Sequence, residues 1–159
     1  MEMTDEVRSQ SGLKIHAVQG KEGGKAMLEA VKKYFALCES FSEDEEAFRE
    51  ILHPDMEQTE FPNLLTERVT VSDYATLLSR VPKGKLLLQS QTFDLQRAFE
   101  AGDALIAEVI WTGTVGTDLG SFRQGQELKA YFCCVFEFRD GKIYRQRNYD
   151  CFERFDVNA

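Results

Sequence analysis

The chain has 159 residues, a net charge of −8 and a hydrophobic content of 43%, with twelve phenylalanines. A chain of this length forms one domain that buries enough surface to fold without a disulfide or a metal ion. The hydrophobic content excludes global disorder, and an acidic surface repels phosphate backbones, so nucleic acid is not an expected partner.

The first ten residues, MEMTDEVRSQ, contain no apolar segment of the kind found in signal peptides. No apolar run approaches the roughly 20 residues of a membrane span. We therefore expect a cytoplasmic protein with no membrane partner. Its cysteines, Cys38, Cys133, Cys134 and Cys151, are expected to be reduced packing residues. Cys133 and Cys134 are adjacent on a predicted strand and should point to opposite faces.

The chain begins with a polar stretch, residues 1–24, that ends in glycines. We expect a flexible or loosely attached leader there, in which residues 13–18 could form a short strand. The single domain is expected to comprise residues 25–159. It begins with apolar residues at three- and four-residue steps between Met27 and Phe41, which predict an amphipathic helix.

Two shorter helices are predicted next. A capping box that starts at Ser42 begins the second helix, and Pro54 marks its end because a proline disfavours helical backbone in the residue before it. A strand is expected at residues 55–61. Ser72 is the predicted cap of the third helix, which should end at Pro82.

The second half of the chain changes to long strands. We expect these at residues 85–99, 104–115, 126–139 and 142–152. The Ala101-Gly102-Asp103 segment is a turn signal and Asp140-Gly141 is a hairpin signal. The apolar face of such a sheet needs a cover, which the early helices can provide. The predicted fold class is therefore α+β, with three N-terminal helices on a meander of strands.

Residues 25–155 resemble the NTF2-like superfamily, in its SnoaL-like and ketosteroid-isomerase-like branch. The resemblance rests on the helix order, on Glu60-Phe61-Pro62, on the turn at Gly102, and most specifically on the closing stretch from Asp140 to Asp150. It implies a curved antiparallel sheet wrapped around three helices, which together form a cone with a small-molecule pocket at the open end. Many members form homodimers through the outer face of the sheet.

The catalytic residues of a ketosteroid isomerase do not carry over to this sequence. The position of its aspartate base, just before Pro62, holds Phe61, and the position of its protonated aspartate holds Cys134. Only the tyrosine of the first helix has a counterpart, which is Tyr34. Ketosteroid isomerisation is therefore not an expected activity.

The last strand offers a different candidate. In limonene-epoxide-hydrolase-like members this strand ends in an aspartate that acts as general base on water, and Asp150 stands at that position. The inner Arg–Asp pair of those members would fall near Val109 and Trp111, which carry no charge. The resemblance therefore implies that Asp150 is a general base, but that the Arg–Asp pair of the epoxide-hydrolase site is missing.

The polar side chains of Gln146, Asn148 and Asp150 are spaced by two and share one face of the last strand. The resemblance makes this the concave face, where polar groups need a partner, water or a ligand. We expect Asp150 to be a catalytic base that Asn148 and Gln146 orient. The alternative is that Asp150 is exposed, or is paired with a neighbouring arginine.

The other expected binding residues are Tyr34, Glu60, Phe61, Trp111, Phe132, Cys134 and Phe136. Glu60 would be a second carboxylate, which permits acid–base chemistry if the two pKa values differ. The alternation in residues 55–61 leaves open whether Glu60 or Phe61 faces the pocket. The two histidines, His16 and His53, form no metal-ligand cluster, so we expect neither metal nor cofactor.

The sequence thus favours a protein that binds a small, largely apolar metabolite in the cone. Catalysis would be cofactor-free acid–base chemistry of the isomerase, dehydratase, cyclase or hydrolase type. The alternative is a non-catalytic binding or dimerisation module of the same fold. A homodimer is expected because apolar side chains gather on the outer face of the sheet, where polar ones would be usual. They are Ile106, Ile110, Tyr131, Cys133 and Val135. The alternative is that the leader, residues 1–24, folds over this patch.

Overall fold

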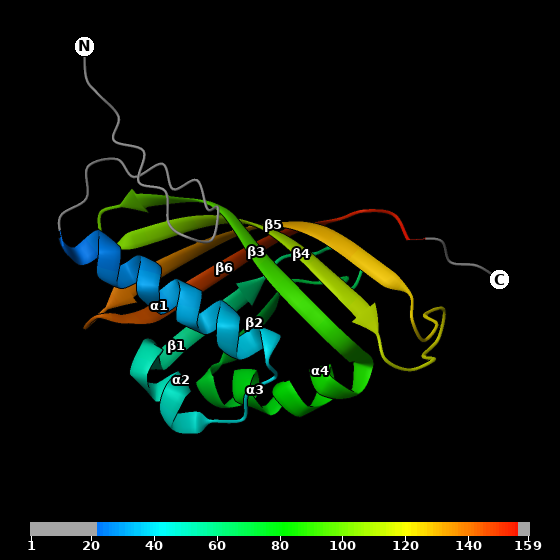
Figure 1. Ribbon diagram of the computed structural model, residues 1–159. Coiled ribbons are helices and arrows are strands. Elements are labelled where there is room, and N and C mark those ends of the chain that lie inside the picture. The colour runs from blue at the N-terminus through cyan, green and yellow to red at the C-terminus, as the bar shows by residue number, and fades with distance from the viewer. Residues whose placement is uncertain (1–21, 156–159) are drawn as a thin grey trace, which may run out of the picture.

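The computed structural model describes residues 22–155. The helices are α1 (Glu22–Glu39), α2 (Glu45–Ile51), α3 (Tyr74–Ser79) and α4 (Val81–Leu87). The strands are β1 (Leu52–Glu60), β2 (Thr70–Asp73), β3 (Leu88–Ala101), β4 (Ala104–Val115), β5 (Glu127–Arg139) and β6 (Lys142–Phe152). The strands form one curved sheet, and the helices lie on its concave side (Figure 1).

The strand order across the sheet is β2-β1-β6-β5-β4-β3. Neighbouring strands are antiparallel except β1 and β6, which run parallel, so the sheet is mixed rather than antiparallel throughout. The parallel pair joins the first strand to the last and sets Glu60 opposite Asn148. The predicted α+β class and NTF2-like cone are confirmed. Two details are corrected: the sheet is mixed, and the described residues form four helices rather than three.

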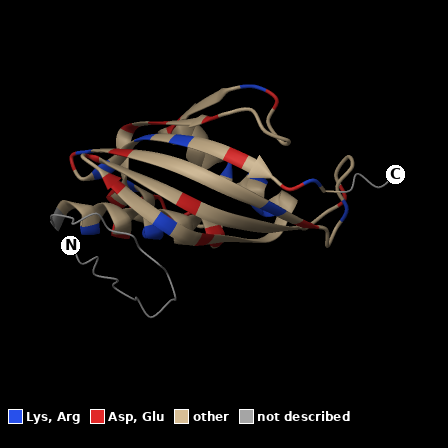
Figure 2. Cartoon of the chain, turned by 90° about the horizontal axis from the view of Figure 1, so that it is seen from above, with Lys and Arg blue, Asp and Glu red and all other residues tan. Residues whose placement is uncertain are grey.

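The outer face of the sheet carries ion pairs between neighbouring strands, and charges of both signs are scattered over it (Figure 2). Arg145 pairs with Glu57, and Arg147 with Glu137. Both arginines therefore point away from the concave face, as strand alternation predicts for neighbours of Gln146.

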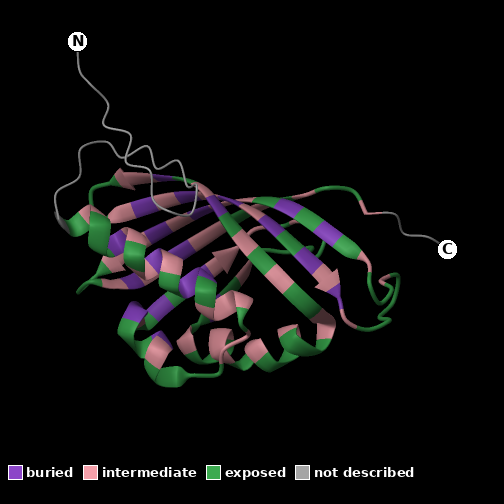
Figure 3. Ribbon diagram, in the orientation of Figure 1, coloured by how far each residue is buried: buried purple, intermediate pink, exposed green. Residues whose placement is uncertain are grey.

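The main hydrophobic core lies between α1 and the concave face of the sheet (Figure 3). Val31 of α1, Phe136 of β5 and Ile143 of β6 have no exposed surface. Fully burying a side chain of this kind stabilises the fold by about 1.5–3 kcal/mol. Burial alternates along β4 from Ala104 to Val115, which is the period of a strand with one covered face.

The capping residues differ from the sequence prediction. Asp44, rather than Ser42, caps α2, because its extended backbone aims the carboxylate at the Ala47 amide, which donates to it over 3.2 Å. The hydroxyl of Ser42 accepts instead from the amide of Asp44. In the described range α2 ends at Ile51, before Pro54, which lies inside β1.

The region around α3 departs furthest from the prediction. The short strand β2 was not predicted, and Ser72 is buried in it, while Asp73 caps α3 by accepting from the amide of Thr76 at 2.8 Å. Pro82 and Gly84 do not end a helix but belong to α4. A proline is tolerated in the first turn because the N–H that it lacks has no partner there.

The turns between the long strands are confirmed. Gly102 has φ 61°, and the hairpin residues Asp140 and Gly141 have φ 52° and 74°, values that suit glycine and, less often, aspartate. Residues 22–24, predicted as part of the leader, form the start of α1. The expectations for the rest of the leader, including a strand at 13–18, lie outside the described residues.

Candidate functional site

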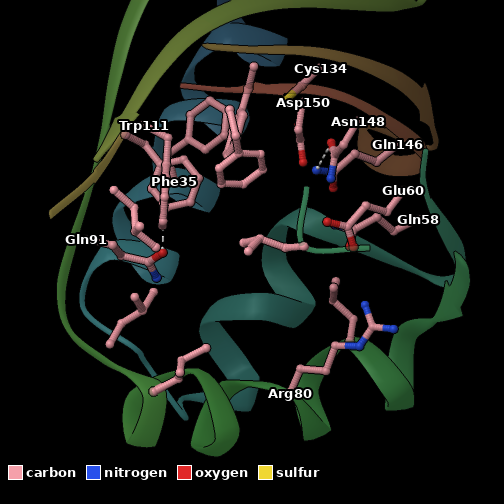
Figure 4. Close-up of a pocket in the computed structure, with 18 of the residues that line it drawn as sticks. Phe35, Gln58, Glu60, Arg80, Gln91, Trp111, Cys134, Gln146, Asn148 and Asp150 are labelled. Atoms are coloured by element: carbon pink, nitrogen blue, oxygen red, sulfur yellow. Dashed lines mark hydrogen bonds between the residues drawn. The ribbon is translucent and has the colours of Figure 1, made fainter. Parts of the chain in front are cut away.

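A cavity of about 280 Å³ lies between the concave face of the sheet and helices α1, α3 and α4 (Figure 4). Most of its wall is apolar. The polar and charged lining residues are Tyr34, Gln58, Glu60, Arg80, Gln91, Gln146, Asn148 and Asp150. A mainly apolar cavity with a few convergent polar groups is typical of a small-molecule site.

The predicted pocket residues separate into two groups. Those that line the cavity are Tyr34, Glu60, Trp111, Phe132, Cys134, Gln146, Asn148 and Asp150. Phe61 and Phe136 are outside the lining. Glu60 therefore faces the cavity, and the choice that the sequence left open is resolved in its favour.

Physical reasons account for both residues outside the lining. Phe61 follows Glu60 and points to the opposite face, where it stacks on Tyr149 with ring centroids 4.6 Å apart. Phe136 does lie on the concave face, but nearer the covered end of the cone. There it packs edge-on against Tyr34 and Phe35 of α1 at 5.9 and 5.8 Å, and it is fully buried.

Asp150 is the most unusual group in the cavity. Its Oδ1 atom is buried and has no hydrogen-bond partner among residues 22–155. Burial, followed by the negative charge of Glu60, raises the pKa of this carboxyl to about 7. Both effects disfavour the charged form. A carboxyl with this pKa exchanges a proton readily at neutral pH, which is the property of a general base.

The expected orientation of Asp150 by its neighbours is not seen. Gln146 donates from Nε2 to Oδ1 of Asn148 at 3.0 Å, but no hydrogen bond joins either of them to Asp150 in the described part of the chain. Gln146 is buried, and its Oε1 lacks a partner there. The hydrogen bond from Gln146 therefore fixes the orientation of the Asn148 side chain. The Oε1 atom of Gln146 can still accept a hydrogen bond beside the cavity.

The Tyr34 hydroxyl lies in the cavity wall, within hydrogen-bonding reach of the side chains of Gln58, Gln146 and Cys38. It accepts from Nε2 of Gln58 at 3.0 Å, so its own hydrogen remains for donation. Burial raises the pKa of Tyr34 well above its ordinary value, which keeps the phenol neutral. Burial likewise raises the pKa of the Cys134 thiol, so this cysteine is a neutral wall residue and not a nucleophile.

Trp111 forms the aromatic wall. Its ring stacks on Phe132 at 5.8 Å, and its indole N–H donates to Oε1 of Gln91 at 3.0 Å. Gln91 in turn donates to the backbone oxygen of Cys38 at 2.8 Å. The Trp111 N–H is therefore occupied, and the residue offers a ligand its apolar face.

Sequence reasoning missed three polar lining residues. Gln58 carried a usable signal, because it lies two residues before Glu60 and shares its strand face. Gln91 shares a strand face with Phe93, which also lines the cavity, but no residue of that strand was predicted as a wall residue. Arg80 carried none: it was expected in the last turn of the third helix, but it lies between α3 and α4.

No group of three or more His, Cys, Asp or Glu side chains within residues 22–155 is arranged to hold a metal ion. His53 lies away from the cavity, with Nε2 3.5 Å from the carboxylate of Asp140 and its ring against Tyr144. The other histidine, His16, is outside the described residues. In the same range none of the helices has the length and apolar character needed to cross a membrane. The four cysteines are free, and Cys133 and Cys134 differ in burial as opposite faces require.

Comparison with known proteins identifies the fold. The family profile of the SnoaL-like domain matches residues 31–146. In sequence, no curated protein matches the chain.

Solved structures match over most of the chain. IdmH, a candidate polyketide cyclase from Streptomyces antibioticus, has a TM-score of 0.66 at 16% identity, with 78% of this chain and 91% of that chain covered. A candidate SnoaL-like polyketide cyclase from Jannaschia sp. CCS1 has a TM-score of 0.67 at 15% identity, with 83% and 90% covered. AclR, a candidate hydroxylase from Streptomyces galilaeus, has a TM-score of 0.60 at 14% identity, with 82% and 79% covered. At these identities the likeness shows a common fold.

Proposed function

The chain belongs to the SnoaL-like domain family, and we propose that it binds a small, largely apolar carbonyl compound and catalyses cofactor-free proton transfer with Asp150 as general base. The observation that carries this proposal is the Asp150 carboxyl, which lies in the cavity and has a pKa of about 7. Its Oδ1 atom is buried and has no hydrogen-bond partner within the described part of the chain. Such a group is half ionised at neutral pH and gains a proton easily.

The neighbouring groups suit enolate formation. The Asp150 carboxylate would take a proton from the carbon beside a carbonyl, and the electron pair of that C–H bond would pass to the carbonyl oxygen. The Tyr34 hydroxyl and the side-chain amide of Asn148, both in the cavity lining, could donate to that oxygen. Asp150 would then return the proton to carbon or to a product oxygen, which closes the cycle without a cofactor.

The reaction type that this chemistry favours is cyclisation or isomerisation. An enolate carbon can attack a second carbonyl of the same molecule, and two of the structural neighbours are described as candidate polyketide cyclases. The apolar wall of Trp111 and Phe132 would hold the chain or ring of such a substrate.

The test is proton exchange on a model ketone. We expect the protein to accelerate the exchange of the α-protons of 2-tetralone in D₂O above the buffer rate, measured by proton NMR. The Asp150→Asn variant should lose roughly 100-fold or more of this rate. Asp94→Asn, an exposed carboxylate on β3, is the matched control and should exchange at the wild-type rate. Equal rates for Asp150→Asn and wild type would refute the base assignment.

The alternative is a binding module without chemistry. It predicts that the ketone binds, as seen from perturbation of the Trp111 indole N–H signal, and that exchange stays at the buffer rate in wild type. Trp111 is the sole tryptophan, so this signal is unambiguous.

We also propose a homodimer through the outer face of the sheet. Tyr131 is paired across strands with Ile110, and Cys133 with Tyr149. Tyr131 and Tyr149 are each 45% exposed. This apolar patch across β4, β5 and β6 is of the kind that a second copy covers.

Sedimentation equilibrium at micromolar concentration tests the dimer. Val135→Glu places a charge within the patch and should convert the dimer to monomer. Leu86→Glu adds the same charge on α4, at a residue 76% exposed, and should remain dimeric. A monomeric wild-type chain would overturn the proposal.

A further inference from the structure

We infer that Arg80 forms an anion-recognising subsite beside the cavity, and that the ligand is an elongated apolar molecule carrying a carboxylate. This inference rests on the proposed function of the cavity and adds a substrate class to it.

Arg80 lies where two hollow spaces adjoin. It lines the main cavity and also a second chamber of about 180 Å³ beneath α3 and α4. The residues that line both spaces are Tyr34, Leu77, Arg80, Leu88 and Gln91. The rest of the second chamber is bounded mainly by apolar side chains, among them Phe41, Phe48 and Val81. Arg80 therefore stands at the boundary of the two spaces, on the helical side of the main cavity (Figure 4).

The guanidinium of Arg80 has no ion pair or hydrogen bond with the side chains and backbone of residues 22–155, although the residue is half-buried. The other half-buried arginines of the same range are both paired, Arg145 with Glu57 and Arg147 with Glu137. The arginines of that range that also lack an ion pair are exposed to solvent: Arg68, Arg123, Arg139 and Arg154. A half-buried cation has lost part of its hydration, and without a counter-ion nothing in the fold offsets that loss. A ligand carboxylate would supply the two oxygens that the planar guanidinium fits best.

The positions of the charged groups orient such a ligand. Arg80 rises from the helical side of the cavity, and Asp150 descends from the sheet on the opposite side (Figure 4). A ligand anion at Arg80 would therefore stand away from the Asp150 carboxyl, with its apolar part between them. Its reactive carbonyl would then lie at the Asp150 end.

Glu60 also lines the cavity, and the competing explanation is that Arg80 serves only to offset its charge. No ion pair joins the two in the described residues. The two explanations differ in one respect: recognition by Arg80 requires that anionic ligands be preferred over neutral ligands of the same shape, whereas charge balance does not.

The experiment compares 2-naphthoate with 2-acetonaphthone, which share a ring system and differ in the charge of the side group. Affinities are measured by isothermal titration calorimetry at about pH 6, where Asp150 is mostly protonated and repels an anion least. The Trp111 indole N–H signal reports that each ligand occupies the cavity. We expect wild type to bind the carboxylate about tenfold more tightly than the ketone.

Variants make the result specific. Arg80→Gln should bring the ratio of the two affinities to about one, because the loss falls mainly on the carboxylate, and Arg80→Lys should restore part of the preference. Arg68→Gln removes the same charge from an exposed residue outside the cavity lining and should keep the wild-type ratio. Unchanged melting temperatures would show that the variants fold.

The outcomes separate this inference from the proposed function. If both ligands bind with similar affinity, or if Arg80→Gln keeps the preference, the anion subsite is refuted while the cavity remains a small-molecule site. If neither ligand perturbs the Trp111 signal, both the inference and the proposed binding function are refuted.

Discussion

The two sides of the cavity are built differently. On the sheet side, most of the inward-facing residues of β4 and β5 are buried, among them Val109, Trp111 and Cys134. On the opposite side, α3 and α4 contain no buried residue, and Leu86 is 76% exposed. The sheet holds Asp150, whose position decides the proposed chemistry, while the helical side is the less tightly packed of the two. A site is more precise when its reactive group lies on a rigid element.

The largest expected effect tests this difference in packing. Phe136→Ala removes a fully buried ring from the sheet side and should lower the free energy of unfolding by about 3–5 kcal/mol. Leu86→Ala on α4 should change it by less than about 0.5 kcal/mol. Urea unfolding followed by circular dichroism measures both. Similar losses for the two variants would show that α4 is packed as tightly as the sheet.

The next effect concerns the stability cost of the buried carboxyl. The pKa of Asp150 is higher in the folded protein, about 7, than its ordinary value, so the folded state binds more protons between about pH 4 and pH 7. Wild-type stability should therefore fall as pH rises through this window and level off above it.

Asp150→Asn removes this dependence. The variant should be more stable than wild type by roughly 1–3 kcal/mol at about pH 8, after allowing for the partial exposure of the carboxyl. The gain should vanish near pH 4. Urea unfolding at the two pH values is the measurement, and a variant that is less stable at pH 8 would mean that the ionised carboxylate is stabilised by contacts in the fold.

A smaller effect tests the contribution of Glu60. Its negative charge is the second cause of the raised Asp150 pKa, so Glu60→Gln should lower that pKa. Glu57→Gln, on the same strand but paired with Arg145 on the outer face, should leave it unchanged. Carbon-13 NMR of the carboxyl signals follows both. An Asp150 pKa that is unaffected by Glu60→Gln would leave burial as the sole cause.

The sheet side was also the part that sequence predicted best. The strands Ala104–Val115 and Lys142–Phe152 were predicted with the bounds that the structure has. Alternation with period two also placed Gln146, Asn148 and Asp150 on one face correctly. This signal can be read within each strand, because a long strand with one covered face alternates between apolar and polar residues along its own sequence.

The helical side was predicted poorly for physical reasons. Pro82 and Gly84 are usual helix-ending residues, yet they lie in α4, where the proline occupies the first turn. The strand β2 is four residues long and too short for a period to be recognised. Phe136 lies outside the cavity because α1 covers that part of the sheet. The alternation of residues along one strand predicts which face a side chain is on, but not which part of that face a helix covers.

The central claim is that Asp150 is a proton acceptor poised near neutral pH inside the cavity. Its most direct test is a carbon-13 NMR titration of the Asp150 side-chain carboxyl in the full chain, assigned by the loss of its signal in Asp150→Asn. We predict a midpoint near pH 7. A midpoint at or below about 3.9, the ordinary value for aspartate, would show a solvated or ion-paired carboxylate and would contradict its role as the general base.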